Sequence, residues 1–253
     1  MINNLIPVKL SNSEVYFREL TFYEYKNICK MLLSDDSKHV SDCFNRIIVD
    51  TCIYDNVYFD IIDKFKCIIT IRNTVLGNEV TFLDDGKKIT LDISLLLDKD
   101  FDNTPIEYDI FTFQSPVDFY ISSYDEFVSQ CLVKVKDTCV RDLTIKQKAD
   151  ILNETSLSLT NIFKQIHDEF SERRITIFKD KTINIYNSME LLSLLKNIFQ
   201  EDLNNILQFE YICMRNLNLR SEDFKMYTYP ELKIFLNHLN KELRDSNQGS
   251  SEG

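Results

Sequence analysis

The stretch VYFRELTFYEYKNICKMLL, residues 15–33, decides how this chain folds, because an alternating pattern of apolar residues gives way there to a helical one. Residues 8–20 alternate around a Ser-Asn-Ser-Glu turn, which predicts a β-hairpin. Thr21 and Glu24 have the spacing of a capping box, in which each side chain accepts a hydrogen bond from the other residue's backbone amide. We therefore expect a helix to begin at Thr21 and to turn an apolar stripe toward a core. The stripe consists of Phe22, Tyr25, Ile28, Cys29 and Leu32.

Helical spacing continues beyond this stretch. Two further apolar stripes predict helices at about 37–53 and 57–72. Because the connections between these three helices are short, the pattern favours an antiparallel bundle.

After the third helix the apolar period falls to two. The sequence NEVTFLDDGKKITLDI, residues 78–93, predicts a hairpin about its central Asp-Gly pair. Further strands are expected at 107–116 and 129–137. The middle segment, residues 76–142, therefore predicts a small antiparallel sheet.

The last part of the chain returns to helix. Short helical patterns at 144–152 and 157–170 precede a hairpin pattern at 174–186. Ser188 is placed to cap one long helix, which we expect to continue to about residue 217.

The final helix repeats the opening pattern. Thr228 and Glu231 form a second capping box, with Pro230 in the first turn. Its apolar stripe consists of Leu232, Phe235, Leu236, Leu239 and Leu243. Residues 246–253 are small and polar, which predicts a flexible tail.

Together these elements predict an α+β fold that is predominantly α-helical. We expect one compact unit over residues 1–245, in which helices from both chain ends form a bundle and the middle segment adds a small antiparallel sheet at one side. Its three parts are 1–75, a hairpin plus helices; 76–142, rich in strands; and 143–245, helical with a hairpin near 174–186.

Composition narrows the class of protein. The 253 residues are 44% hydrophobic and 27% charged, and the net charge is −11. This charge disfavours nucleic acid and anionic membranes as partners, because both select for clustered Lys and Arg. No signal peptide and no apolar run of membrane-spanning length occurs. The seven cysteines include no C-x-x-C pair, so we interpret them as reduced thiols of a cytosolic protein.

Motifs that carry chemistry are incomplete. Four scattered glycines cannot form a phosphate-binding loop, and no G-x-S-x-G motif is present. Asp98, Asp100 and Asp102 match the first positions of a calcium loop, but Asn103 and Asp109 stand where that loop needs glycine and glutamate. We therefore expect no catalytic residue, no cofactor and no metal site.

The histidines and the paired acids also lack the arrangement of a catalytic or metal site. His39, His167 and His238 stand apart, without the spacing of a zinc site. Asp168 follows His167 directly, and adjacent helical residues are expected to point apart.

Two stretches could instead contact a partner protein. In IFTFQSPVDFY, residues 110–120, an exposed aromatic cluster would mark a binding site; the alternative is burial beneath a helix. The predicted partner-binding residues are Phe111, Phe113, Phe119 and Tyr120. A basic cluster of Arg173, Arg174, Lys179 and Lys181 is either a solvated sheet edge or a docking patch for an acidic partner.

Both chain ends resemble a known family. IPVKLSNSEVYFRELTFYEYKNICKMLLSDD, followed by FNRIIVDTCI, is similar to the start of the baseplate hub assembly proteins of T-even-type bacteriophages, in which a hairpin leads through a Leu-Thr-x-x-Glu turn into paired helices. The segment LLKNIFQEDLNNILQFEYICMRNLNLRSEDFKMYTYPELKIFLNHLNKEL resembles the end of the same family. The resemblance covers residues 4–75 and 143–245, and is loose over 76–142.

The resemblance implies a function without enzymatic residues. It implies a non-enzymatic assembly factor, a chaperone that binds hub or tape-measure protein in the cytoplasm of the infected cell. A permanent structural component of the baseplate hub is the alternative. An unrecognised enzyme is a third possibility, which a pocket with convergent polar groups would support.

Overall fold

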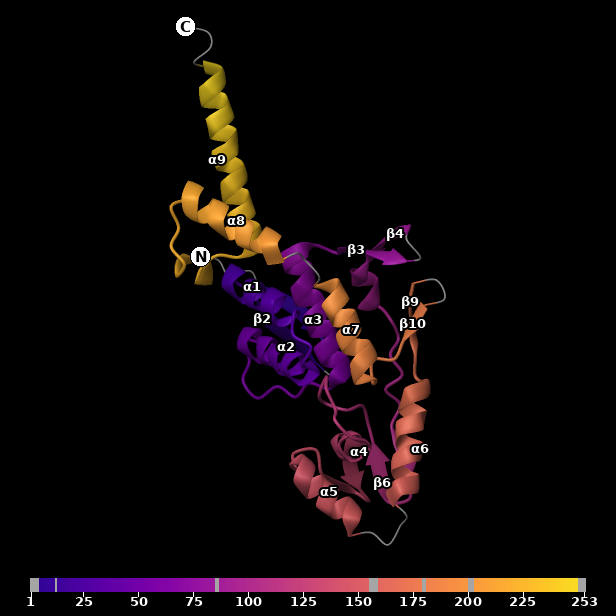
Figure 1. Ribbon diagram of the computed structural model, residues 1–253. Coiled ribbons are helices and arrows are strands. Elements are labelled where there is room, and N and C mark those ends of the chain that lie inside the picture. The colour runs from indigo at the N-terminus through magenta and orange to yellow at the C-terminus, as the bar shows by residue number, and fades with distance from the viewer. Residues whose placement is uncertain are drawn as a thin grey trace.

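The computed structural model describes residues 5–11, 13–84, 87–154, 159–178, 181–199 and 203–249. It has a mixed α+β architecture, mainly helical with small antiparallel sheets, as expected (Figure 1). The helices are α1 (Phe22–Met31), α2 (Ser37–Thr51), α3 (Ile61–Leu76), η1 (Ile93–Leu96), α4 (Tyr124–Cys131), α5 (Ile145–Asn153), α6 (Leu159–Glu172), α7 (Ser188–Ile198), α8 (Leu203–Asn216), η2 (Asp223–Lys225) and α9 (Tyr229–Gly249). The strands are β1 (Leu5–Lys9), β2 (Glu14–Arg18), β3 (Glu79–Asp84), β4 (Lys87–Asp92), β5 (Ile106–Tyr108), β6 (Phe111–Phe113), β7 (Leu132–Val135), β8 (Thr138–Cys139), β9 (Ile175–Phe178) and β10 (Lys181–Ile183).

The opening hairpin and the first helix form as the sequence predicts. Strands β1 and β2 pair antiparallel, with Val8 opposite Val15 on the buried face. At the start of α1 the Thr21 amide donates to Glu24 Oε2 at 2.9 Å, and the Glu24 amide donates to Thr21 Oγ1 at 3.3 Å. This capping box satisfies two of the amides that a helix start leaves unpaired.

Helix α3 is the central helix. It begins after Asp60, whose Oδ1 accepts from the Asp63 amide at 2.9 Å, rather than at residue 57. Asn56, in the preceding turn, has a φ of 59°. Buried residues occupy most of the surface of α3, and a polar stripe of Lys66, Thr70 and Asn73 is half-buried. It ends at Gly77, whose φ of 80° favours glycine.

A buried polar cluster ties the middle segment to α3. Asp60 Oδ2 accepts hydrogen bonds from Asn103 and from Ser115, each at 3.1 Å. Asp63 Oδ1 accepts from the amide of Ser11 at 2.9 Å and from its hydroxyl at 3.0 Å. Two carboxyl groups thus lie in one buried region, where burial and the charge of Asp60 raise the pKa of Asp63.

The middle segment does not form one sheet. Among the described strands, β3 and β4 pair only with each other, whereas β5, β6, β7 and β8 form a separate four-stranded antiparallel sheet. The strand expected at 107–116 is two short strands, since Asp109 turns the chain with a φ of 53°. The strand expected at 129–137 begins only at Leu132, because Ser123 caps α4 and residues 129–131 complete that helix.

The later helices divide between two regions. Helices α5 and α6 pack on α4 beside the four-stranded sheet, at the end of the molecule away from α9. Helices α7, α8 and α9 contact α2, α1 and α3 respectively (Figure 1). The N-terminal helices therefore meet only part of the 143–245 segment.

The single long helix expected from Ser188 to residue 217 is two helices. Helix α7 is capped by Asn187, whose side chain accepts from the amides of the next turn, and α7 ends before Phe199. Phe199 is fully buried, and its ring lies 5.7 Å from that of Phe44 on α2. Helix α8 then begins at Leu203. At the C-terminus, α9 continues through residues 246–249, which the sequence assigned to the polar tail.

Candidate partner-binding groove

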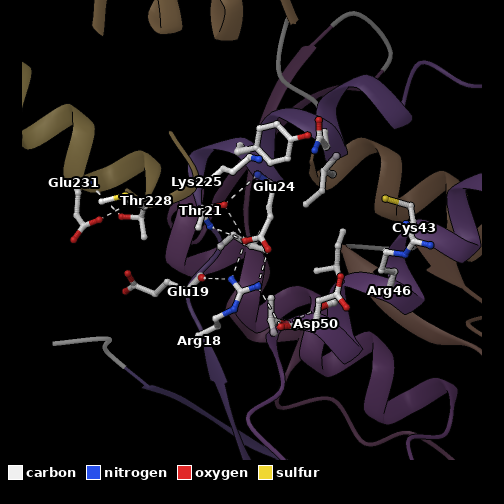
Figure 2. Close-up of a pocket in the computed structure, with 17 residues that line it drawn as sticks. Arg18, Glu19, Thr21, Glu24, Cys43, Arg46, Asp50, Lys225, Thr228 and Glu231 are labelled. Atoms are coloured by element: carbon white, nitrogen blue, oxygen red, sulfur yellow. Dashed lines mark hydrogen bonds and ion pairs between the residues drawn. The ribbon is translucent and has the colours of Figure 1, made fainter. Parts of the chain in front are cut away.

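The two chain ends meet at the starts of α1 and α9. Thr21 and Thr228 form an isolated antiparallel bridge, and the Phe22 amide donates to the Tyr227 carbonyl at 2.7 Å. The second capping box is also formed: the Thr228 amide donates to Glu231 Oε2 at 2.8 Å. The two helices with the same capping sequence therefore begin side by side (Figure 2).

A cluster of aromatic side chains packs at this junction. The Phe22 ring lies 5.6 Å from Phe209, 5.2 Å from Phe224 and 5.8 Å from Tyr229, measured between ring centroids. Tyr25 lies 5.4 Å from Tyr229. Such pairs contribute about 0.5–1.5 kcal/mol each beyond the burial of their area. The cluster joins α1 to α8, η2 and α9, which gives the junction a rigid base.

A groove of about 590 Å³ lies above this base, between the end of β2, α1, α2 and the start of α9. Leu20, Ile28 and Ile47 supply apolar surface and are buried. Tyr23 and Met226 also line the groove and remain exposed, by 38% and 54%. The groove therefore offers apolar contact on its floor and on two exposed side chains.

Charged groups of both signs surround the apolar surface. Arg18 donates two hydrogen bonds to the Glu24 carboxylate, at 2.8 and 2.6 Å, and a third to the Asp50 carbonyl at 3.2 Å. Burial alone would raise the pKa of Glu24, but the hydrogen bonds from Arg18 and Thr21 outweigh it and hold that pKa below its ordinary value. Glu24 therefore stays charged and holds Arg18 in place.

Two other cationic side chains, Lys225 and Arg46, line the groove. The Lys225 ammonium lies 5.2 Å from the Tyr23 ring centroid. Arg46 lines the groove beside Cys43, and no hydrogen bond or ion pair joins its side chain to another described residue. Arg46 is therefore available to an acidic group of a ligand.

Cys43 brings a thiol to the groove. Burial raises the pKa of its thiol, although Arg46 opposes that shift. The thiol therefore stays protonated and weakly nucleophilic near neutral pH. The groove's charged and apolar groups are suited to holding a polypeptide by ion pairs and apolar contact.

Three of the four predicted partner-binding residues belong to the core. Phe111, Phe113 and Phe119 are fully buried, and Tyr120 is half-buried. Thr112 is buried too, so both faces of β6 are covered. Of the two alternatives for this stretch, burial is the one found, because β6 is an inner strand of the four-stranded sheet and its rings serve packing. A partner-binding role for these four residues stays a prediction.

The basic cluster also makes internal contacts. Arg174 pairs with Glu190 at 2.6 Å, and Arg173 lies 3.5 Å from Asp102 and 4.5 Å from the Phe170 ring centroid. Lys179 lies outside the described residues. Both arginines are thus held by neighbours, which weakens the docking-patch interpretation.

The partial calcium loop does not gather its acids. Asp102 accepts from the Thr104 amide at 3.0 Å, while Asp98 and Asp100 are exposed. Within the described ranges, no group of three or more His, Cys, Asp or Glu side chains could hold a metal ion. His167 and Asp168 approach to 3.5 Å, which corrects the expectation that they point apart. Their side chains are long enough to meet over one helix surface.

The sequence patterns did not predict the groove. The repeated Thr-x-x-Glu motif was a signal for two helix starts, and both starts are present. Nothing in either motif says that the two starts pair with each other. That pairing depends on contacts between residues roughly 200 positions apart in the chain.

No helix in the described part of the chain combines the length and apolar character needed to cross a bilayer. Comparisons with protein-family models, curated proteins and solved structures find no match. The case for a function therefore rests on the groove and on the sequence patterns that build it.

Proposed function

We propose that this chain is a non-enzymatic assembly factor of bacteriophage tails, a chaperone that binds hub or tape-measure protein during baseplate morphogenesis in the host cytoplasm. One observation carries the proposal. The two segments that resemble the hub assembly family, one at each chain end, meet at the Thr21–Thr228 bridge and together line the groove. A permanent place in the baseplate hub is the second candidate, since the same groove could hold a neighbour in the finished particle.

The physical action would be masking. Tail components that have not yet assembled expose apolar seams, and an amphipathic helix of such a component can lay its apolar face into a groove between helices. The exposed Tyr23 and Met226 would extend that apolar contact. The net charge of −11 would keep the complex soluble and disfavour association between complexes.

The bundle expected from both chain ends belongs to the same proposal. Contacts of α7, α8 and α9 with α2, α1 and α3 support it, because they place C-terminal helices against each N-terminal one. We infer that these six helices act as one unit that presents the groove.

The test is recovery of a tail protein. Tagged chain purified from phage-infected cells should retain hub or tape-measure protein, identified by mass spectrometry. Arg46→Glu should lower that yield at least tenfold, because it reverses the available cation of the groove. The matched control is Arg215→Glu, at an exposed position of α8, which makes the same charge change outside the groove and should leave the yield unchanged.

Two outcomes count against the proposal. Retention of no tail protein would contradict an assembly role of either kind. A fixed stoichiometric signal of this chain in purified virions would favour the permanent hub component over the chaperone.

A further inference from the structure

A second cavity, of about 800 Å³, lies away from the groove, between the β3–β4 hairpin, the β9–β10 hairpin and α7. Figure 1 shows the two hairpins at the same side of the molecule, beside α7. The lining is mainly apolar. Most of the apolar surface comes from Val80, Leu91, Ile93, Ile177, Leu194 and Ile198.

The cavity runs along the edge of β3. The side of β3 away from β4 faces the end of α7, because Arg72 of α3 joins the two. Arg72 donates to the Glu79 carbonyl at 3.0 Å and to the carbonyl of Ile198, which lines the cavity, at 2.9 Å. Because β3 pairs only with β4 among the described strands, that side carries backbone groups that no other described strand pairs with.

The hydrogen bonds at the start of β3 identify those groups. The Asn78 carbonyl accepts from the Ile93 amide at 2.9 Å, toward β4, whereas the Glu79 carbonyl accepts from Arg72 at 3.0 Å, away from it. Backbone groups of successive residues in a strand alternate in direction. The amide and carbonyl of Thr81 therefore point away from β4, toward the cavity.

The position opposite Thr81 is consistent with this assignment. Thr81 pairs in register with Thr90 on β4, and their hydroxyl oxygens lie 3.1 Å apart. Such close side chains are typical of a pair that exchanges no backbone hydrogen bonds. The amide of Thr90 consequently points to the outer edge of β4, and Thr90 does not line the cavity.

The cavity has its own charge. Lys88 and Lys181 are the charged residues of its lining, and none of the described lining residues is acidic. This basic character stands out in a chain of net charge −11. A segment that presents apolar and acidic side chains would match both the lining and the lysines.

We propose that this cavity receives an extended segment of a partner polypeptide, with apolar residues alternating with acidic ones, which adds as a strand along the open edge of β3. Main-chain hydrogen bonds to Thr81 would set its register, apolar side chains would pack on Val80 and Leu194, and acidic ones would pair with Lys88 and Lys181. The inference rests on the proposed function only for the identity of the partner.

A synthetic peptide tests this directly. The probe is a fluorescein-labelled 12-residue peptide in which Val alternates with Glu, and the comparison peptide has Lys in place of Glu. Fluorescence anisotropy with the full chain should show binding of the acidic peptide and at least tenfold weaker binding of the basic one.

Two pairs of variants locate the site. Thr81→Pro removes the amide at the open edge and should abolish binding, whereas Thr90→Pro makes the same change at the other edge and should preserve it. Lys88→Glu with Lys181→Glu should weaken binding at least tenfold. Lys134→Glu with Lys146→Glu, at exposed positions outside the cavity, changes the net charge equally and should have no effect.

Other results would overturn the proposal. Equal binding of the two peptides, or equal losses in a variant and its control, would mean that the peptide does not add to β3. If light scattering showed a dimer that Thr81→Pro converts to a monomer, the edge would belong to a second copy of this chain. Recovery of tail proteins from infected cells is independent of these results, so either proposal can fail without the other.

Discussion

The two capping boxes differ in one contact, because Arg18 binds the glutamate of the first box. Glu24 caps α1 and also receives two hydrogen bonds from Arg18, whereas Glu231 caps α9 and has no arginine within the hydrogen bonds described for it. Hydrogen bonds between charged groups are roughly twice as strong as neutral ones. The first box should therefore depend on the charge of its glutamate, and the second should not.

Glu24→Gln should lower the free energy of unfolding by about 2 kcal/mol, because it weakens the paired hydrogen bonds to Arg18. Glu231→Gln is the matched control and should cost less than about 0.5 kcal/mol, since its amide oxygen can still accept from Thr228. Urea denaturation measures both. The pKa of Glu24 is lowered in the fold, so its contribution is present above the ordinary value of 4.5 and is lost as pH falls below it. Equal losses at neutral pH would contradict a special role for Arg18.

Asp63 has the opposite sign of pH dependence. Burial, and then the charge of Asp60, raise the pKa of Asp63, so the fold favours the protonated form. The free energy of unfolding should therefore fall as pH rises from 3.8, the ordinary pKa of the group, through its raised pKa in the fold. Asp63→Asn should flatten this slope while keeping the acceptor for Ser11. Denaturation between pH 4 and 7 is the measurement, with exposed Asp125→Asn as the control; an unchanged slope in Asp63→Asn would count against this account.

At the scale of elements, the junction of α1, α8, η2 and α9 depends on Phe22. Its ring is fully buried and contacts three other rings. Phe22→Ala should lower the free energy of unfolding by about 3–5 kcal/mol, as a cavity in a packed core does. Phe235→Ala, whose ring is 42% exposed, should cost less than about 1 kcal/mol. Comparable losses in chemical denaturation would show that the junction adds little.

Local patterns predicted elements well where the deciding contacts are local. The opening hairpin, α2 and both capping boxes follow from spacing and turn chemistry within a few residues. The break after α7 was missed because the apolar pattern runs on through it. The helix ends at Phe199, whose ring packs on Phe44, a contact that no local pattern contains. The start of β7 was missed because an apolar run suits either a strand or the end of a buried helix.

The candidate site was less predictable than the elements. An aromatic cluster such as Phe111, Phe113 and Phe119 could form an exposed binding surface, but the sheet and its helices cover all three residues. Whether an apolar strand face is covered depends on which elements pack there, and α5 and α6 turn toward the middle segment rather than toward the chain ends. The groove and the open edge of β3 both arise from such long-range placement.

For the whole molecule, the C-terminal segment should be needed to close the core. A chain truncated after residue 220 loses Phe224 and Tyr229, which cover Phe22. Its free energy of unfolding should fall by at least about 3 kcal/mol, and it should bind a hydrophobic dye such as ANS. Truncation after residue 245 removes only the end of α9, beyond the buried Leu236, and should leave both readouts unchanged. If the chain truncated after residue 220 stayed stable and bound no dye, this dependence would be refuted.

The pairing of Thr21 with Thr228 also has a consequence for timing during protein synthesis. A ribosome releases the first threonine long before it has made the second, so the groove cannot exist on a nascent chain. Any ligand that needs both walls of the groove must wait until translation is nearly finished. A message that ends early would thus yield a chain in which one wall of the groove is absent.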